Sequence, residues 1–213
     1  VGDDRQKVAI QVEKQDAENG ATVAGAVFGI YNTEDLKNEK GEIIVKADTL
    51  LQEMTSDEDG EAVFTVDLPL GQYYVKELKA PAGFVSSDEI LTFDASYQGQ
   101  DIAVVKLKEV KKNQPTTVEI TKSDITTGTE LEGASLKILD KDGNVVDEWT
   151  SVKDQPHVIK RLVVGEEYTL REEIAPYGYL KATDIKFTLE DTAEVQKVEM
   201  KDEVPTALLI INK

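Results

Sequence analysis

The chain has 213 residues, with 24 basic and 42 acidic side chains, one histidine and no cysteine. Without cysteine there are no disulfides or thiolate metal sites, and a lone His157 argues against Ser-His-Asp or multi-histidine metal chemistry. A formal net charge of −18 disfavours nucleic acid and anionic membranes as partners, because phosphate binding depends on Lys and Arg. No apolar run approaches the length of a transmembrane helix.

Short alternating segments separated by Gly, Pro, Asn and Asp predict strands along the whole chain. The strands predicted in the first half are 8–13, 26–31, 62–66, 73–77, 90–93 and 102–108. Those predicted in the second half are 117–121, 135–139, 145–150, 157–162, 168–172, 185–189 and 195–200. One helical turn is expected, at 47–54. Many short strands at this spacing predict an all-β fold built from Greek-key β-sandwiches.

The two halves are copies of one repeat. The segment KQDAENGATVAGAVFGI at 14–30 returns as KSDITTGTELEGASLKI at 122–138, and YYVKELKAPAGF at 73–84 returns as YTLREEIAPYGY at 168–179. The first copy is longer between these motifs, and we place the extra residues within the polar segment 32–60. We therefore predict one domain at 1–114 and another at 115–205, with 206–213 as the start of a further repeat or a terminal strand.

Each copy carries a glutamate on the apolar face of a middle strand. The alternation that points Tyr73 inward also points Glu77 inward, and Glu172 follows Tyr168 in the same way. A carboxylate in this position is costly unless it is protonated or paired. Its occurrence in both copies suggests that each glutamate has a chemical role.

A lysine and an Asn or Asp complete the group in each copy: Lys122 ends the first strand of the second copy, and Asp202 ends its last strand. First and last strands of a Greek-key sandwich can lie side by side. Burial lowers the pKa of a lysine and raises that of a glutamate, so a neutral amine can attack a side-chain carbonyl while the acid moves the proton. The product would be an isopeptide bond made once, so no enzymatic turnover is expected. The alternative is a buried salt-bridged triad that never reacts.

In the first copy Lys14 and Glu77 take the corresponding places, and two residues compete as acceptor. Asn113 lies just before Pro-Thr, as the acceptor position of the second copy lies just before a Val-Pro-Thr segment. Strand parity instead aligns Glu109 with Asp202, in which case only a salt bridge to Lys14 would form. We favour Asn113.

The ordered set KxD…GxxLxGAxL, GxYxLxExxAPxGY and VxMxD resembles the CnaB-type (SpaA-like, prealbumin-like) domains of Gram-positive surface proteins and pilins, over essentially the whole chain. The resemblance implies Ig-like or prealbumin-like sandwiches, with Lys122 and Asp202 bonded and Glu172 as catalyst. It also implies an extracellular segment of a cell-surface or cell-wall-anchored protein. Its expected partners are neighbouring domains of that protein, and a host or matrix ligand if the segment is a ligand-binding module. No cofactor, metal or membrane contact is expected.

The sequence allows two other functions. In a ligand-binding module, the enlarged segment 32–60 would form a recognition surface. A hydrolase would use paired carboxylates, but Glu172 and Glu173 are adjacent in a strand and point to opposite faces. The acidic clusters at 57–60 and 140–143 are read as hairpin turns, because neither continues into a twelve-residue calcium loop.

Overall fold

The computed structural model describes residues 6–206, and the chain divides into two compact units between Pro115 and Thr116. The described residues form strands and turns without any helix, which confirms the all-β prediction. No helix long and apolar enough to cross a membrane occurs among them. The expected further strand at 206–213 falls, beyond Thr206, outside the described residues.

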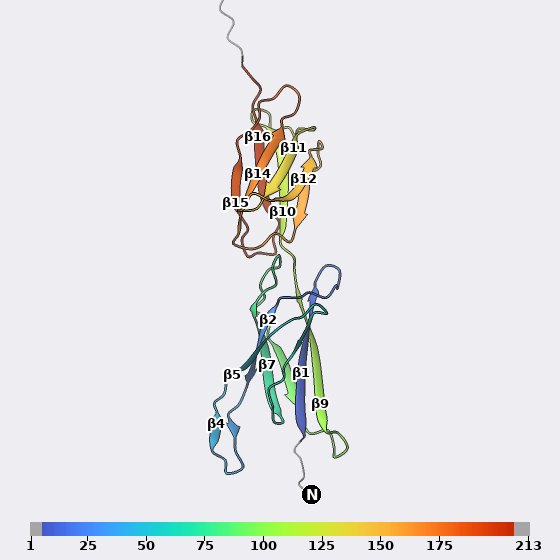
Figure 1. Ribbon diagram of the computed structural model, residues 1–213, viewed down its shortest axis with the longest axis vertical. Helices are drawn as coiled ribbons and strands as arrows, with labels where there is room; N and C mark the ends of the chain where they lie inside the picture. Colours follow the sequence, from blue (N-terminus) through green and yellow to red (C-terminus); the bar gives the residue numbers. More distant parts are fainter. Residues whose placement is uncertain (1–5, 207–213) are drawn as a thin grey trace, which may run out of the picture. The chain divides into compact units, whose positions relative to one another are not determined.

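The first unit is a sandwich of a three-stranded and a four-stranded sheet, with a small hairpin beside them (Figure 1). Its three-stranded sheet has the order β6-β1-β9, formed by Glu61–Val63, Lys7–Asp16 and Val104–Asn113. Its four-stranded sheet has the order β5-β2-β7-β8, formed by Leu50–Thr55, Val27–Asn32, Gly71–Lys79 and Leu91–Ala95. The hairpin consists of β3 (Leu36–Lys37) and β4 (Ile43–Val45).

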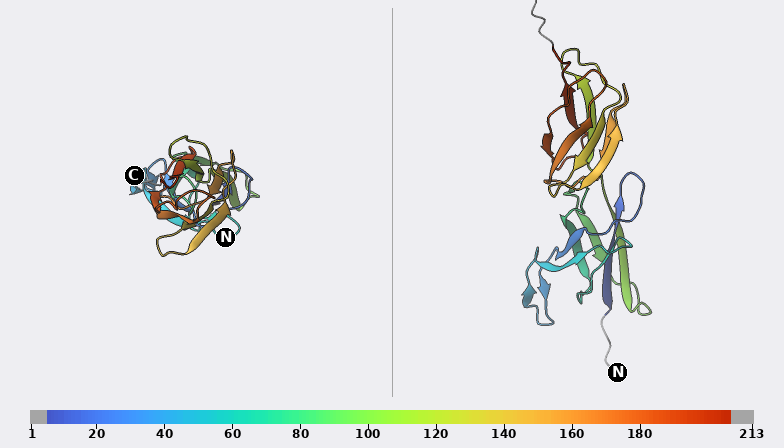
Figure 2. Two further views of the ribbon diagram at one scale, coloured as in Figure 1. Left: turned by 90° about the horizontal axis from the view of Figure 1, so that it is seen from above. Right: turned by 45° about the horizontal axis from the view of Figure 1, so that its top comes forward.

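The second unit repeats this arrangement without the hairpin, as the right-hand view of Figure 2 also shows. Its three-stranded sheet has the order β13-β10-β16, formed by His157–Lys160, Thr117–Asp124 and Gln196–Asp202. Its four-stranded sheet has the order β12-β11-β14-β15, formed by Val145–Thr150, Ser135–Leu139, Glu167–Ile174 and Ile185–Thr188. A tight turn closed by Asp140 N–H donating to the Asn144 carbonyl replaces the hairpin.

The expected helical turn at 47–54 is wrong. Residues 50–55 form β5, which pairs antiparallel with β2 from Val27↔Thr55 to Tyr31↔Leu50. Backbone pairing with a neighbouring strand outweighs the local helical preference of this segment, because tertiary context overrides such weak propensities.

The strand that begins each domain shows why a lysine reaches the interior. In β1 every second residue is buried, so that Val8, Ile10 and Val12 face the core and the same row continues with Lys14 and Asp16. The strand β10 repeats the row with Val118 and Ile120 followed by Lys122 and Asp124. Alternation of side chains along a strand therefore carries both lysines inward.

Both acidic clusters are tight turns, but only the one at 140–143 is the predicted hairpin turn, between the paired strands β11 and β12. The turn at 57–60 connects β5 and β6, which belong to different sheets, so the hairpin prediction is wrong there. Asp57 Oδ1 accepts hydrogen bonds from the backbone N–H groups of Asp59 and Glu61. Asp140 Oδ1 accepts in the same way from Asp142 and Asn144. These carboxylates satisfy their own loop backbone, which is the usual use of Asp in tight turns. No cluster of potential metal ligands occurs among residues 6–206.

Candidate functional site

The first and last strands of each domain are parallel neighbours, and this pairing brings the candidate residues together. In the first domain the register sets Lys14 opposite Lys111 and Asp16 opposite Asn113. In the second domain it sets Lys122 opposite Met200 and Asp124 opposite Asp202. Asn113 and Asp202 thus occupy equivalent positions: each lies on the last strand, two residues after the residue that pairs with the lysine.

Glu109, the competing acceptor, lies outside the site. It is exposed and pairs with Val12, so its counterpart in the second domain is Val198, which pairs with Ile120. Glu109 and Asn113 have the same strand parity, which is why parity alone did not separate them. The difference is that β9 continues as a strand to Asn113, beyond the predicted end at 108.

The two glutamates come from equivalent strands and sit beside equivalent irregularities. Glu77 of β7 pairs with Phe28, and Glu172 of β14 pairs with Leu136. In both pairs the register shifts at that point, which leaves one extra residue immediately after the glutamate. Such β-bulges commonly re-aim side chains beside functional sites. No pattern in the sequence indicated these bulges.

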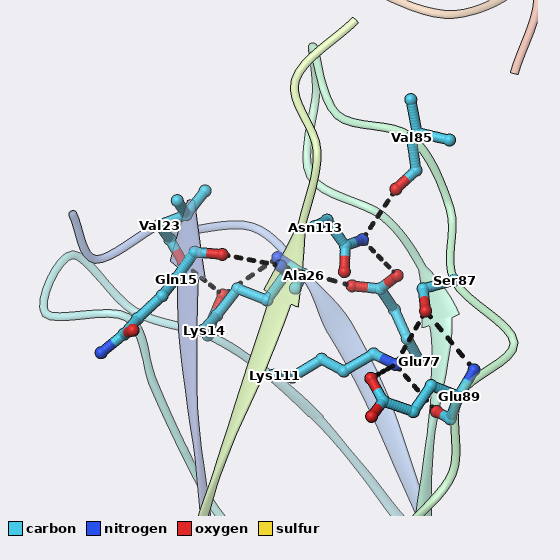
Figure 3. Close-up of polar contacts among 11 residues, drawn as sticks. Lys14, Gln15, Val23, Ala26, Glu77, Val85, Ser87, Glu89, Lys111 and Asn113 are labelled. Atoms are coloured by element: carbon cyan, nitrogen blue, oxygen red, sulfur yellow. Dashed lines mark hydrogen bonds and ion pairs between the residues drawn. The ribbon is translucent and has the colours of Figure 1, made fainter. Parts of the chain in front are cut away.

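In the first site, Figure 3 shows Lys14 and Asn113 both directed toward Glu77. Lys14 Nζ lies 4.0 Å from Glu77 Oε1, and both side chains are buried. Asn113 Nδ2 donates to Glu77 Oε2 at 2.6 Å and to the Val85 carbonyl oxygen at 2.9 Å. Glu77 Oε1 and Asn113 Oδ1 are buried without a hydrogen-bond partner in the described structure. The glutamate therefore links the amine to the nitrogen that would depart from Asn113.

Burial lowers the pKa of Lys14 to about 8, and the charge of Lys111 acts in the same direction, whereas Glu77 and Asp16 oppose the shift. With a pKa of about 8, roughly one amine in ten is uncharged at pH 7, against about one in several thousand for an ordinary lysine. The uncharged amine is the nucleophilic form. Phe84 covers this amine, with its ring centroid 5.9 Å from Nζ.

In the second site the same three positions are in closer contact. Lys122 Nζ contacts Asp202 Oδ1 directly and lies 3.0 Å from Glu172 Oε1, with all three side chains buried. Glu172 Oε2 accepts a hydrogen bond of 2.7 Å from the Ala182 N–H. Burial raises the pKa of the Asp202 carboxyl, and the hydrogen bond and charge of Lys122 oppose this shift. A protonated carboxyl is the form that can lose its oxygen as water.

A second buried lysine, Lys111, lies beside the first site and was not predicted from the sequence. Lys111 Nζ donates to Ser87 Oγ at 2.8 Å, to the Glu89 carbonyl at 2.9 Å and to Glu89 Oε2 at 2.9 Å. Its side chain is 1% exposed. In the sequence EVKKN, Lys111 looks like an exposed surface lysine. The one indication of burial is that it lies on the same face of β9 as buried Val105 and Asn113.

Two sandwiches in tandem, each with a buried lysine, glutamate and Asn or Asp between its parallel first and last strands, place the chain in the class of prealbumin-like domains. The family model described as "SpaA: Prealbumin-like fold domain" matches residues 8–110 and again 116–204. The chain belongs to this family. No curated protein matches it.

Several solved structures are similar to the chain. The Bacillus anthracis TIE protein is 27% identical with a TM-score of 0.57, and the match covers 93% of this chain and 34% of that one. The chain thus spans about a third of the length of that protein. A C-terminal fragment of the pilus adhesin SpaC from Lactobacillus rhamnosus GG is 16% identical with a TM-score of 0.56, and the match covers 96% of this chain and 100% of the fragment. The shaft pilin SpaA of the same organism is 18% identical with a TM-score of 0.41, over 96% and 99% of the two chains.

Proposed function

We propose that the chain is a structural segment of a Gram-positive cell-surface or pilus protein, and that an isopeptide bond closes each domain. The observation that carries the proposal is the placement of a buried lysine and a buried Asn or Asp on adjacent first and last strands, around one buried glutamate. Membership in the prealbumin-like family and similarity to a pilus adhesin fragment support the same function.

The proposed reaction needs no cofactor. The Lys14 amine attacks Cγ of Asn113 and the bond from Cγ to Nδ2 breaks. Glu77 takes the proton that the attacking nitrogen loses and supplies one to the departing nitrogen, which leaves as ammonia. In the second domain the Lys122 amine attacks Cγ of Asp202, and the expelled oxygen leaves as water with a proton delivered by Glu172. Each product is an amide bond between two side chains.

The position of the bond suits a load-bearing role. Because β1 and β9 are parallel, the chain enters the first domain at the start of one strand and leaves it at the end of its neighbour. A bond from Lys14 to Asn113 would carry a pulling force directly between these strands and bypass the rest of the sandwich. In the second domain the linked residues are 80 positions apart. Treated as a cross-link of the unfolded chain, such a bond stabilises by roughly 4–5 kcal/mol.

Intact mass under denaturing conditions tests the proposal. Loss of ammonia and of water should lower the wild-type mass by about 17 and about 18 Da, since each condensation expels that group. Glu77→Ala should abolish the first loss alone and Glu172→Ala the second alone. Glu109→Ala and Glu173→Ala are matched controls, because both glutamates are exposed. A wild-type mass equal to that of the plain sequence would show that neither bond forms.

A cavity favours a second function, ligand binding by the first domain. Its volume is about 610 Å³, and it lies between the β3–β4 hairpin and the segment 66–72, with Leu36, Ile44, Val45 and Leu70 in its lining. The hairpin is what the second domain lacks. Replacing residues 33–49 with the turn at 140–144 should abolish binding to immobilised host matrix proteins if this function exists, and leave both mass deficits unchanged.

A further inference from the structure

Lys111 is a buried charge that the second domain does not have. It pairs with Lys14 across the β1–β9 ladder, at the position where Met200 pairs with Lys122. Both residues are fully buried. A thioether is the ordinary occupant of such a place, whereas a buried ammonium is costly unless it is fully hydrogen-bonded. The first domain therefore has a charge at a position where the second domain shows that an apolar side chain, Met200, is enough for the fold.

The contacts of Lys111 define its protonation state. An ammonium has three N–H donors and no acceptor, and Lys111 has three acceptors within 2.9 Å, one from Ser87 and two from Glu89. Lys111 is thus a fixed ammonium and has no lone pair with which to attack Asn113. The Lys14 amine is held more loosely, 3.3 Å from the Gln15 carbonyl oxygen and 4.0 Å from Glu77. Figure 3 shows Lys14 directed toward Glu77, whereas Lys111 is turned toward Ser87 and Glu89.

Three charged groups act on the Lys14 amine from the elements packed around it. Glu77 from β7 and Asp16 from β1 favour its protonated form, and Lys111 from β9 favours its uncharged form. The acceptor of this domain is a neutral amide, which does not itself take up a proton from the amine. In the second domain the acceptor is a carboxyl group in contact with the lysine, and it must be protonated to react. A positive charge beside the lysine would oppose that protonation, which fits the presence of Met200 there.

On the basis of the proposed isopeptide function, we propose that Lys111 is a positioning residue for the first-domain reaction: its positive charge adds to the effect of burial and increases the fraction of the Lys14 amine in the uncharged form that attacks Asn113. The bond that forms and the ammonia that leaves are those given above. Lys111 gains and loses no proton in the reaction.

The first experiment follows bond formation directly. The full chain is collected unfolded in urea and refolded at a series of pH values from 6 to 10, and the loss of about 17 Da is timed by denaturing mass spectrometry. Lys111→Met, which copies Met200, should slow linking about tenfold at pH 7 and shift the rate profile to higher pH, since a like charge nearby shifts a titration by about one pH unit or more. The rate at high pH should stay near that of the wild type. If the rate were lower at every pH while its pH dependence stayed the same, the proposal would be overturned. Lys111 would then only hold the segment that carries Ser87 and Glu89 in place.

A second variant separates the effect of the Lys111 charge from the effect of its hydrogen bonds to the neighbouring segment. Glu89→Gln removes the carboxylate that partly neutralises Lys111 and weakens its attachment. The proposal predicts a profile shifted to lower pH, opposite to that of Lys111→Met. A role only in holding that segment predicts slower linking in both variants, and that outcome would contradict the proposal.

A third measurement does not depend on the reaction. In an Asn113→Ala background, which has no acceptor, the Lys14 side chain is titrated by NMR with and without Lys111→Met. The titration midpoint should rise when the charge is removed, and an unchanged midpoint would overturn the proposal. If the wild-type chain shows no first-domain mass loss, the proposed bond is wrong, and this titration still decides whether Lys111 controls the protonation of Lys14.

Discussion

The two domains use the same strands for their candidate sites and differ in the charges placed there. The first combines Lys14, Glu77 and the neutral amide of Asn113 with the extra ammonium of Lys111. The second combines Lys122 and Glu172 with the carboxyl of Asp202, and has Met200 in place of the ammonium. An amide acceptor requires only that the amine lose its proton, whereas a carboxyl acceptor must also gain one. Between the two domains, therefore, the acceptor and the surrounding charges change together.

The largest expected effect comes from removing the lysine of the second site. Lys122→Met should abolish the cross-link, worth roughly 4–5 kcal/mol, and leave Glu172 and Asp202 buried without a countercharge, which typically costs about 3–5 kcal/mol. Urea unfolding followed by the single tryptophan, Trp149, reports this domain. Lys137→Met is the control: Lys137 has only a 3.9 Å pair with Glu173, so its loss should change stability by less than about 1 kcal/mol. An unchanged urea midpoint for Lys122→Met would contradict the proposed cross-link and the stabilising role of Lys122.

The first domain should show a pH dependence that arises from Lys14. In an unlinked Asn113→Ala chain, the folded pKa of about 8 lies below the ordinary value of 10.5, so the unfolded state binds more protons between these values. The unfolding free energy of this domain should therefore rise with pH from about 8 to 10.5, by about 3 kcal/mol. Urea titrations followed by first-domain NMR signals measure this slope. A further Lys14→Met substitution should remove it, and a slope that survives this substitution would assign it to other groups.

Gly60 offers a smaller test of how the first domain positions its lysine. Gly60 has φ of +77°, and a Cβ there would lie 2.7 Å from the Lys14 carbonyl oxygen. Gly60→Ala should destabilise the first domain by about 2–3 kcal/mol, from backbone strain and this close approach. Gly143→Ala in the second domain is the control, because φ is +83° but the space is open, so only about 1 kcal/mol is expected. Equal losses in the two variants would show that the contact with Lys14 is unimportant.

Replacing the acceptor Asn113 by Asp is expected to leave the linked product unchanged and to alter only the rate at which it forms. Asn113→Asp should give a linked protein of the same mass as linked wild type, because loss of water from Asp and of ammonia from Asn leave the same amide. Linking at pH 7 should be slower, by about tenfold or more, because the new carboxyl must first be protonated beside Glu77 and against the charge of Lys111. Timed mass spectrometry after refolding checks both points. An equal or faster rate would contradict the view that acceptor and charges are matched.

Local pattern in the sequence was enough to predict the all-β tandem sandwich and most of the strands. The alternation that buries Val8, Ile10 and Val12 also buries Lys14, and the same rule carries Glu77 and Glu172 inward. These predictions succeed because the period of two along a strand is a property of the backbone itself. The repeat then allowed each position in one domain to be compared with its counterpart in the other.

Features that depend on contacts between distant strands could not be read from the sequence and became known from the fold. The parallel register of β1 with β9 placed Asn113 in the site and left Glu109 exposed, although the two have the same parity. Pairing with β2 made residues 50–55 a strand instead of a helical turn. Lys111 is buried because Ser87 and Glu89, from a loop more than twenty residues away, supply its hydrogen bonds. Strand register, bulges and the solvation of a buried charge are set by partners far away in the chain, so no local pattern encodes them.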